Sequence, residues 1–282
     1  MKVYCRNGEY LDEKEYHAKL LAFLYKTILG RVILKKVVNP AFSVKRGYYY
    51  NSRKSKKDII PFARKNNIDL SHWNIDEFNN FNEFFRRKKE VNVECSDLEL
   101  PAIADSKLSV YNIDENLVLK VKNSVYSVAD IVGNETLASR YKNGTCLVFR
   151  LGVEDYHRYI YLDTGELINK YKIDGELHTV RSISEEYNVF SRNNREVSII
   201  KTCHFGEIVQ IEVGALLVGA IKNEPHRIFV KGQEKGYFEY GGSTIVLLFK
   251  EGAVSIDKDI VEQSKLGIET KVSIGEKIGV KC

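Results

Sequence analysis

Residues 231–249, KGQEKGYFEYGGSTIVLLF, decide the fold class of this 282-residue chain. The pair Gly241-Gly242 is typical of a tight turn, because glycine tolerates positive φ. Ser243 then opens the strongly apolar run STIVLLF, and such a run after a turn signal predicts a buried β-strand. The stretch therefore places a serine at the point where a turn enters an interior strand.

The same alternation of turn residues and short apolar runs extends over most of the chain. From about residue 95, short β-branched and aromatic runs alternate with Gly, Asn and Asp turns, as in LSVYNIDENLVLKV at 108–121. This spacing predicts a mostly antiparallel β domain over residues 76–282, barrel-like or sandwich-like. Residues 1–75 are helical and basic in pattern. We therefore expect an α+β fold with a helical N-terminal region over residues 1–75.

The apolar stretch at 20–38, LLAFLYKTILGRVILKKVV, has roughly helical periodicity. Four Lys and Arg residues interrupt it before the ~20 apolar residues that a bilayer span needs. A basic amphipathic helix of this kind either lies in a membrane interface or docks on the protein's own core, and the pattern leaves both open. The segment 75–89 predicts a further helix, whose four phenylalanines share one side and pack into a core.

Composition excludes several classes of protein. The net charge of +5 fits anionic lipid or nucleic acid and selects neither. Five scattered cysteines without a C-x-x-C pair argue against a disulfide framework and a thiolate zinc site, and favour a reducing, cytoplasmic setting. The polar, acidic first residues do not form a secretory signal peptide. Nucleotide-binding and H-E-x-x-H metal motifs are absent, so no metal is expected. The basic, Tyr-rich segment 45–57 lacks a recognised nucleic-acid module, and no nucleic-acid partner is expected.

A Gly-Ser bond in a strained turn can carry chemistry of its own. The serine hydroxyl can attack the preceding carbonyl and convert the amide to an ester, provided that a base takes its proton. β-Elimination of the ester then releases the upstream chain and leaves dehydroalanine, which hydrolyses to a pyruvoyl group. Such a ketone forms a Schiff base with an amine and acts as an electron sink without pyridoxal phosphate. An ordinary turn before a strand remains the alternative.

Six segments resemble the pyruvoyl-dependent phosphatidylserine decarboxylase family in order and approximate spacing, over roughly residues 75–282. They are FNEFFRRKK at 81–89, PAIADSK at 101–107, DYHRYIYLDTG at 155–165, RNNREVSII at 192–200, VGALLVGAI at 213–221 and the opening stretch at 231–249. The resemblance implies an enzyme that decarboxylates phosphatidylserine to phosphatidylethanolamine, a step of phospholipid biosynthesis. It also implies a zymogen that cleaves itself.

The resemblance implies autocatalytic cleavage between Gly242 and Ser243. The products are a large chain, 1–242, and a small chain, 243–282, whose first residue carries the covalent pyruvoyl cofactor. The partners that follow are phosphatidylserine and an anionic membrane surface. The large and small chains of one precursor are also expected to stay bound to each other. A peripheral location on the cytoplasmic side of the cell membrane is expected, and a homo-oligomer is left open.

The resemblance also assigns an Asp-His-Ser relay to Asp105, His157 and Ser243. In this relay the imidazole takes the serine proton while the carboxylate orients the ring. Arg158 is either a phosphate contact or an ion-pair partner.

Three departures from the family pattern bear on the substrate. Ile160 stands where many members have a second histidine, Ser106 replaces a glycine after the motif acid, and Arg181-Ser182 replaces Asn-Pro. Two alternatives therefore stay open. One is a decarboxylase of a smaller amino acid, and the other is an unprocessed, non-enzymatic, membrane-associated homologue.

Overall fold

The computed structural model describes residues 2–13, 18–121, 124–179, 182–216, 220–241 and 243–282. The described helices are α1 (Ala18–Lys26), α2 (Ile28–Val37), α3 (Pro40–Tyr50), α4 (Ile59–Lys65), α5 (Phe81–Phe85), α6 (Val128–Val132), α7 (Glu135–Ala138), α8 (Val189–Arg192) and α9 (Lys258–Lys265), with 3-10 turns η1 (Arg53–Asp58), η2 (Ile75–Glu77), η3 (Ser139–Tyr141) and η4 (Ser182–Tyr187).

The strands follow the same numbering along the chain. They are β1 (Lys2–Cys5), β2 (Tyr10–Asp12), β3 (Glu99–Pro101), β4 (Ser106–Asn112), β5 (Val118–Val121), β6 (Ser124–Ser127), β7 (Thr145–Leu151), β8 (Arg158–Ile160), β9 (Gly165–Ile173), β10 (Arg195–Thr202), β11 (Glu207–Val213), β12 (Ile221–Asn223), β13 (Ile228–Phe229), β14 (Glu234–Phe238), β15 (Ser243–Phe249), β16 (Val254–Ile256), β17 (Glu269–Val272) and β18 (Lys277–Lys281).

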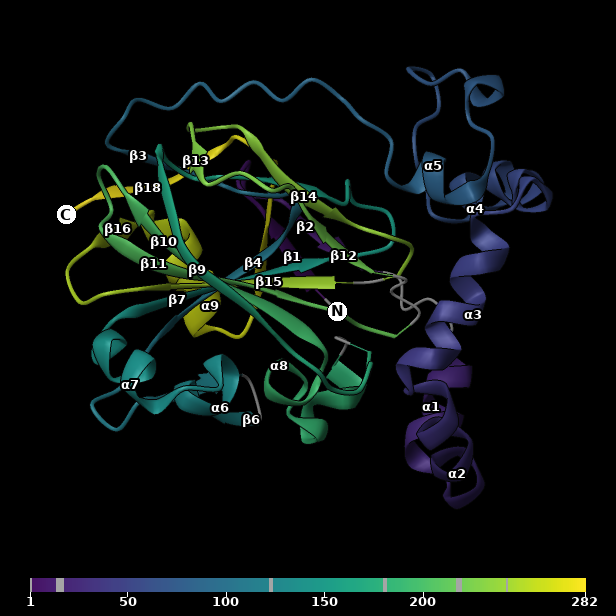
Figure 1. Cartoon of the computed structure of the whole chain (residues 1–282), viewed down its shortest axis with the longest axis horizontal. Coiled ribbons are helices and arrows are strands. Elements are labelled where there is room, and N and C mark those ends of the chain that lie inside the picture. The colour runs from purple at the N-terminus through teal and green to yellow at the C-terminus, as the bar shows by residue number, and fades with distance from the viewer. Residues whose placement is uncertain (1, 14–17, 122–123, 180–181, 217–219, 242) are drawn as a thin grey trace.

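A ten-stranded sheet with the order β13-β9-β10-β11-β15-β7-β4-β17-β1-β2 runs through the centre of the molecule (Figure 1). Its neighbours are antiparallel except for β1 and β17, which are parallel. Two three-stranded sheets, β12-β14-β8 and β16-β18-β3, and the β5-β6 hairpin complete the β structure. The expected α+β class with a mostly antiparallel β part is confirmed, and the sheets are open and stacked.

Both faces of the central sheet are covered, which explains why β15 reads as a continuous apolar run. Ile245, Leu247 and Phe249 pack into a core shared with the two small sheets and α9. Val246 and Leu248 point to the other face, into a core shared with α6, α7 and α8. Because alternate side chains of a strand face opposite sides, all positions of β15 become interior. Ser243 thus begins a strand that is closed off from water.

The N-terminal helices form a separate column beside the sheets (Figure 1). The stretch at 20–38 is two helices rather than one, since Thr27 caps α2 by accepting a hydrogen bond from the Gly30 amide at 2.9 Å. A Cβ at Gly30 would collide with the carbonyl of Phe23, so glycine allows α1 and α2 to pack closely. Helices α3 to α5 enclose an aromatic core that also receives Tyr240 of the β domain.

Two expectations for the first third differ from the structure. Strands β1 and β2 add the segment Lys2–Asp12 to one edge of the central sheet, ahead of the first helix. The helix expected at 75–89 is reduced to η2 and α5, because the Asn80 side chain caps a new helix by accepting from the Glu83 amide. The phenylalanines of α5 are buried as expected. A domain boundary between residues 75 and 76 stays a prediction.

Among the described residues, no helix combines the length and the hydropathy that crossing a membrane requires.

Candidate active site

Ser243 begins β15 between β11 and β7, directly opposite Leu151. Its side chain is completely buried, and its Oγ has no hydrogen-bond partner among the described atoms. A buried hydroxyl without a partner costs about 1–3 kcal/mol, so it calls for an explanation. Gly241, two residues earlier, has a φ of 136° that only glycine adopts easily. Gly242, the other half of the expected cleavage site, lies outside the described residues.

His157 is also completely buried, in the turn between β7 and β8. Its Nδ1 lies 2.9 Å from the backbone carbonyl oxygen of Asp155, and its Nε2 has no partner among the described atoms. The ring of Phe85 packs against the imidazole with centroids 4.2 Å apart. Burial lowers the pKa of His157 to about 3, and the nearby positive charge of Arg87 acts in the same direction.

These contacts define the proton distribution on the ring. A carbonyl oxygen only accepts hydrogen bonds, so Nδ1 of His157 carries the proton and donates it to Asp155. The neutral imidazole then has its lone pair on the unpartnered Nε2. His157 is therefore set up to accept a proton from a neighbouring group.

The structure brings His157 next to the segment that ends at Ser243. The backbone carbonyl of His157 accepts a hydrogen bond from the Phe238 amide at 2.9 Å. Phe85, which covers the imidazole, also contacts Tyr240, with centroids 5.2 Å apart. Between the two side chains themselves, the described contacts include no hydrogen bond. The site thus combines the buried hydroxyl of Ser243 and the buried imidazole of His157, which can accept a proton, on adjoining segments.

Asp105 lies in the bend before β4, and its carboxylate is occupied by other partners. Oδ2 lies 2.7 Å from the Lys89 ammonium, and Oδ1 accepts from the Ile274 amide at 2.7 Å. Among the described contacts, the imidazole of His157 is bonded to the carbonyl of Asp155 instead. Asp105, Asp155 and Tyr156 line a polar cavity of about 610 Å³ on one side of the histidine turn. Membership of Asp105 in the relay stays a prediction.

Arg158 has the geometry of a structural ion pair. Its Nη1 lies 2.6 Å from a Glu234 oxygen, and its Nε donates to the carbonyl of Arg86 at 2.7 Å. The guanidinium also lies over the ring of Tyr237, 4.9 Å from the centroid. Of the two roles left open by the sequence, these contacts favour the ion pair.

Asp155, whose carbonyl accepts the hydrogen bond from the imidazole, has no predicted role in the sequence. Its position in DYHR, two residues before the histidine, was the available signal. A backbone contact leaves no trace in residue type, so only the structure could identify it.

An apolar cavity of about 390 Å³ opens between the N-terminal helices and the start of β15. Its apolar lining comes from Leu20, Leu21, Leu24, Ile33, Val37, Phe42, Phe62, Leu151, Val153, Ala215, Leu216 and Tyr240, and Gly241 lies in its wall. Arg46, Lys65 and Arg150 also border it. A mostly apolar pocket with a few charged groups suits a ligand that has both apolar and anionic parts.

The departures from the family pattern are accommodated by the fold where the structure describes them. Ile160 packs in the main core, 2% exposed. The Ser106 hydroxyl donates to the carbonyl of Ala104 at 3.2 Å. Arg181 lies outside the described residues, and Ser182 begins η4. Within the part of the chain that the structure describes, no three His, Cys, Asp or Glu residues converge as metal ligands.

Comparison with known proteins gives a consistent result over the whole chain. The family model for phosphatidylserine decarboxylase matches residues 78–280. A Clostridium acetobutylicum protein named phosphatidylserine decarboxylase proenzyme 2 is 51% identical over 274 residues, which cover 95% of this chain and 94% of that protein. Phosphatidylserine decarboxylase proenzymes of Clostridium tetani and Desulfitobacterium hafniense are 42% and 39% identical, each over 100% of this chain and 98% of the relative.

Proposed function

Because the chain belongs to the phosphatidylserine decarboxylase family, we propose that it is a pyruvoyl-dependent carboxy-lyase that converts phosphatidylserine to phosphatidylethanolamine. Its cofactor is made from Ser243 by self-cleavage. The assignment to particular atoms depends on one observation, which concerns Ser243 Oγ and His157 Nε2. Both are buried, and neither has a hydrogen-bond partner among the atoms that the structure describes.

In the first step, Ser243 Oγ forms a bond to the carbonyl carbon of residue 242. The peptide C–N bond breaks, and an ester joins the two parts of the chain. His157 Nε2 accepts the hydroxyl proton and passes it to the departing amide nitrogen. Because the pKa of His157 is lowered to about 3, the ring is neutral at physiological pH and gives the proton up readily.

In the second step, loss of the α-proton of residue 243 expels the ester oxygen, which leaves as the carboxylate of residue 242. The dehydroalanine that remains takes up water and releases ammonia, which leaves the ketone at the start of the small chain. The third relay member, Asp105, holds Lys89 and the Ile274 amide beside the histidine turn. In this proposal it supports the serine–histidine pair without touching the imidazole.

The ketone, once made, supplies an electrophile for the substrate amine and a sink for the electrons left behind when carbon dioxide departs. The residues of this chain provide the setting. The apolar cavity beside Gly241 has room for acyl-chain segments next to residue 243, and burial of Ser243 and His157 keeps water away from the reacting carbon. Apolar lining favours a lipid over a free amino acid as the substrate.

The same helices that line the cavity offer a membrane-binding surface. On α2, Ile28 and Leu29 are 87% and 64% exposed, and Val32 is also exposed. The turns around them carry Lys26, Arg31, Lys35 and Lys36. Exposed apolar side chains among Lys and Arg are suited to the interface of an anionic bilayer. We therefore place the enzyme peripherally on the cytoplasmic side of the cell membrane, with the cavity mouth towards the lipid.

The direct test is decarboxylation of carboxyl-labelled phosphatidylserine in mixed micelles, with labelled serine as the competing substrate. Release of carbon dioxide from the lipid, and none from serine, is expected for the wild-type chain and not for Ser243→Ala. Preferential release from serine would favour the smaller-substrate alternative. Release from neither by a fully cleaved, folded preparation would contradict the proposal.

A further inference from the structure

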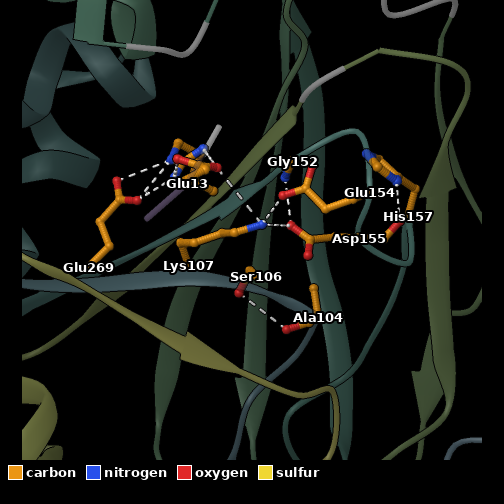
Figure 2. Close-up of polar contacts among 10 residues, drawn as sticks. Glu13, Ala104, Ser106, Lys107, Gly152, Glu154, Asp155, His157 and Glu269 are labelled. Carbon is orange, nitrogen blue, oxygen red and sulfur yellow. Dashed lines mark hydrogen bonds and ion pairs between the residues drawn. The ribbon is translucent and has the colours of Figure 1, made fainter. Parts of the chain in front are cut away.

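The turn that presents His157 is tied to a buried cluster of charged side chains (Figure 2). We propose that Lys107 is a positioning residue for His157, which acts through the side chain and the backbone of Asp155. This inference rests on the proposed role of His157 as the proton acceptor in self-cleavage. It adds a residue that touches neither the hydroxyl nor the imidazole.

Lys107 lies on β4, and only 6% of its side chain is exposed. Its ammonium lies 2.7 Å from Oδ2 of Asp155 and makes a second, shorter ion pair with Glu154. Glu13 lies at 4.0 Å. Figure 2 shows these carboxylates converging on the lysine nitrogen. A lysine ammonium has three donors, and here they are directed at the turn that precedes the histidine.

Asp155 connects this ammonium to the imidazole. Its Oδ2 accepts a hydrogen bond from the Gly152 amide at 2.6 Å, and its own amide donates to the Gly152 carbonyl at 3.1 Å. The turn is therefore closed by both side chain and backbone. The carbonyl of the same residue accepts from His157 Nδ1 at 2.9 Å. A shift of the Asp155 side chain would move the group that sets the ring's orientation and tautomer.

The neighbouring strand explains why the cluster is needed. Lys107 pairs across the sheet with Arg150 of β7, and two cations opposite each other are destabilising unless carboxylates separate them. Glu13 and Glu269 bind the arginine, with Nη2 of Arg150 at 2.9 Å from Glu13. The Asp155 and Glu154 carboxylates are then the partners of Lys107. The shortest ion pairs of Lys107 are therefore with the turn that precedes His157.

Electrostatics link the same groups to His157. Burial raises the pKa of Asp155 to about 6, and Lys107 opposes that rise. For His157, Arg87 and Lys107 lower the pKa, whereas Glu154 raises it. Removal of the lysine charge would therefore raise the pKa of the imidazole and leave the carboxylates of Asp155, 9% exposed, and Glu154, 27% exposed, without their cation.

The test follows self-cleavage of the precursor, which needs no substrate. Precursor made by cell-free translation is moved by dilution to a series of pH values, and conversion of residues 1–282 to two chains is timed. For Lys107→Met we expect cleavage to slow about 10- to 100-fold, the scale of a small misplacement of reacting groups. We also expect the pH below which cleavage slows to rise, because a positive charge near the imidazole is lost. Lys107→Arg should restore most of the rate.

Lys235→Met is the matched control. Lys235 is equally buried and binds Glu212 at 2.7 Å on another pair of strands, so its loss also leaves a carboxylate buried without its cation. We expect it to lower the melting temperature while leaving the pH profile of cleavage unchanged. Asp155→Asn, which retains an oxygen for the Gly152 amide but loses the charge, serves as a second probe if Lys107→Met fails to fold.

The outcomes separate this inference from the proposed function. Slowed cleavage with a shifted pH profile in Lys107→Met or Asp155→Asn, together with rescue by Lys107→Arg, supports the positioning role. If these variants match Lys235→Met in stability loss and keep the wild-type pH profile, the inference is wrong. If His157→Gln cleaves at the wild-type rate, the proposed function fails first, whatever Lys107 does.

Discussion

The central sheet and the N-terminal helices differ in the exposure of their apolar side chains. In β15 every residue is buried, whereas α2 leaves Ile28, Leu29 and Val32 largely exposed. The sheet holds Ser243 in a rigid, dry position, as self-cleavage requires. The helices keep apolar surface available for something outside the chain. In the proposed function the sheet carries the chemistry and the helices carry the lipid contact, with the apolar cavity between them.

The largest expected effect is on the sheet side. Ser243→Ala removes the hydroxyl that is proposed to attack residue 242, and it also removes the buried Oγ that has no partner among the described atoms. We expect no cleavage and no decarboxylation, with a melting temperature equal to or above that of wild type. Gel analysis and thermal unfolding check both. A cleaved Ser243→Ala protein would show that another residue is the nucleophile.

His157→Gln is expected to slow cleavage about 10²- to 10⁴-fold, the usual contribution of a general base. Pulse-chase of the precursor measures it. His204→Gln is the control, because Nδ1 of His204 contacts a side-chain carboxylate, that of Asp163 at 3.0 Å, and His204 lies in another turn of the β domain. Equal slowing by both substitutions would argue that His157 acts only through stability.

The low pKa of His157 also predicts a pH dependence of stability. Between about pH 3, the folded value, and about 6.5, the usual value, the unfolded chain binds the extra proton. The His157 contribution to the free energy of unfolding is therefore present above pH 6.5 and is lost as pH falls towards 3. In the uncleaved Ser243→Ala background, His157→Gln should lose less stability than its parent between pH 7 and pH 5. Urea unfolding at both values measures this, and parallel losses would contradict it.

On the helix side, Ile28→Asp should weaken binding to phosphatidylserine-containing vesicles about tenfold or more, since burial of an isoleucine contributes about 1.5–3 kcal/mol. Ile228→Asp is the control, because Ile228 is 76% exposed on β13, far from the helices (Figure 1). Cosedimentation at low and high salt separates the apolar and ionic contributions. If both variants lose vesicle binding equally, the helices are not the specific membrane-binding surface, and the proposal is contradicted.

The smallest effect is expected where the two regions meet. The Tyr25 hydroxyl of α1 contacts Nδ1 of His178 at 3.2 Å and accepts from the Thr179 amide at 3.1 Å. Tyr25→Phe should lower the free energy of unfolding by about 1 kcal/mol, while exposed Tyr10→Phe should change it little. If Tyr25→Phe unfolds like wild type, the Tyr25 hydroxyl contributes nothing to the docking of α1 on the β part.

The sequence predicted the β part of the molecule better than the helical part. Strand β15 follows from a local pattern of turn and apolar run, which needs no knowledge of distant residues. The strands β1 and β2 could not be predicted in the same way, because β1 joins the sheet through β17, more than 250 residues away in the chain, and β2 pairs only with β1. The break at Thr27 depends on a side-chain cap and a close helix contact that periodicity alone does not show.

The same distinction holds for the site. Ser243 and His157 were found from motifs, and the structure buries both with an unpartnered atom each. For Asp105, the family resemblance implied a place beside the imidazole, but Lys89 and the Ile274 amide occupy its oxygens. The partner of the ring is a backbone carbonyl, which every residue has. Such a contact depends on the geometry of the turn and is invisible in the sequence.

The most direct test of this account is the intact mass of the freshly purified, active protein. We predict two chains, 1–242 and 243–282, with the smaller one blocked at its first residue by a borohydride-reducible carbonyl. A single chain of 32.4 kDa in a preparation that decarboxylates phosphatidylserine would contradict it, because the ketone could not then have come from Ser243.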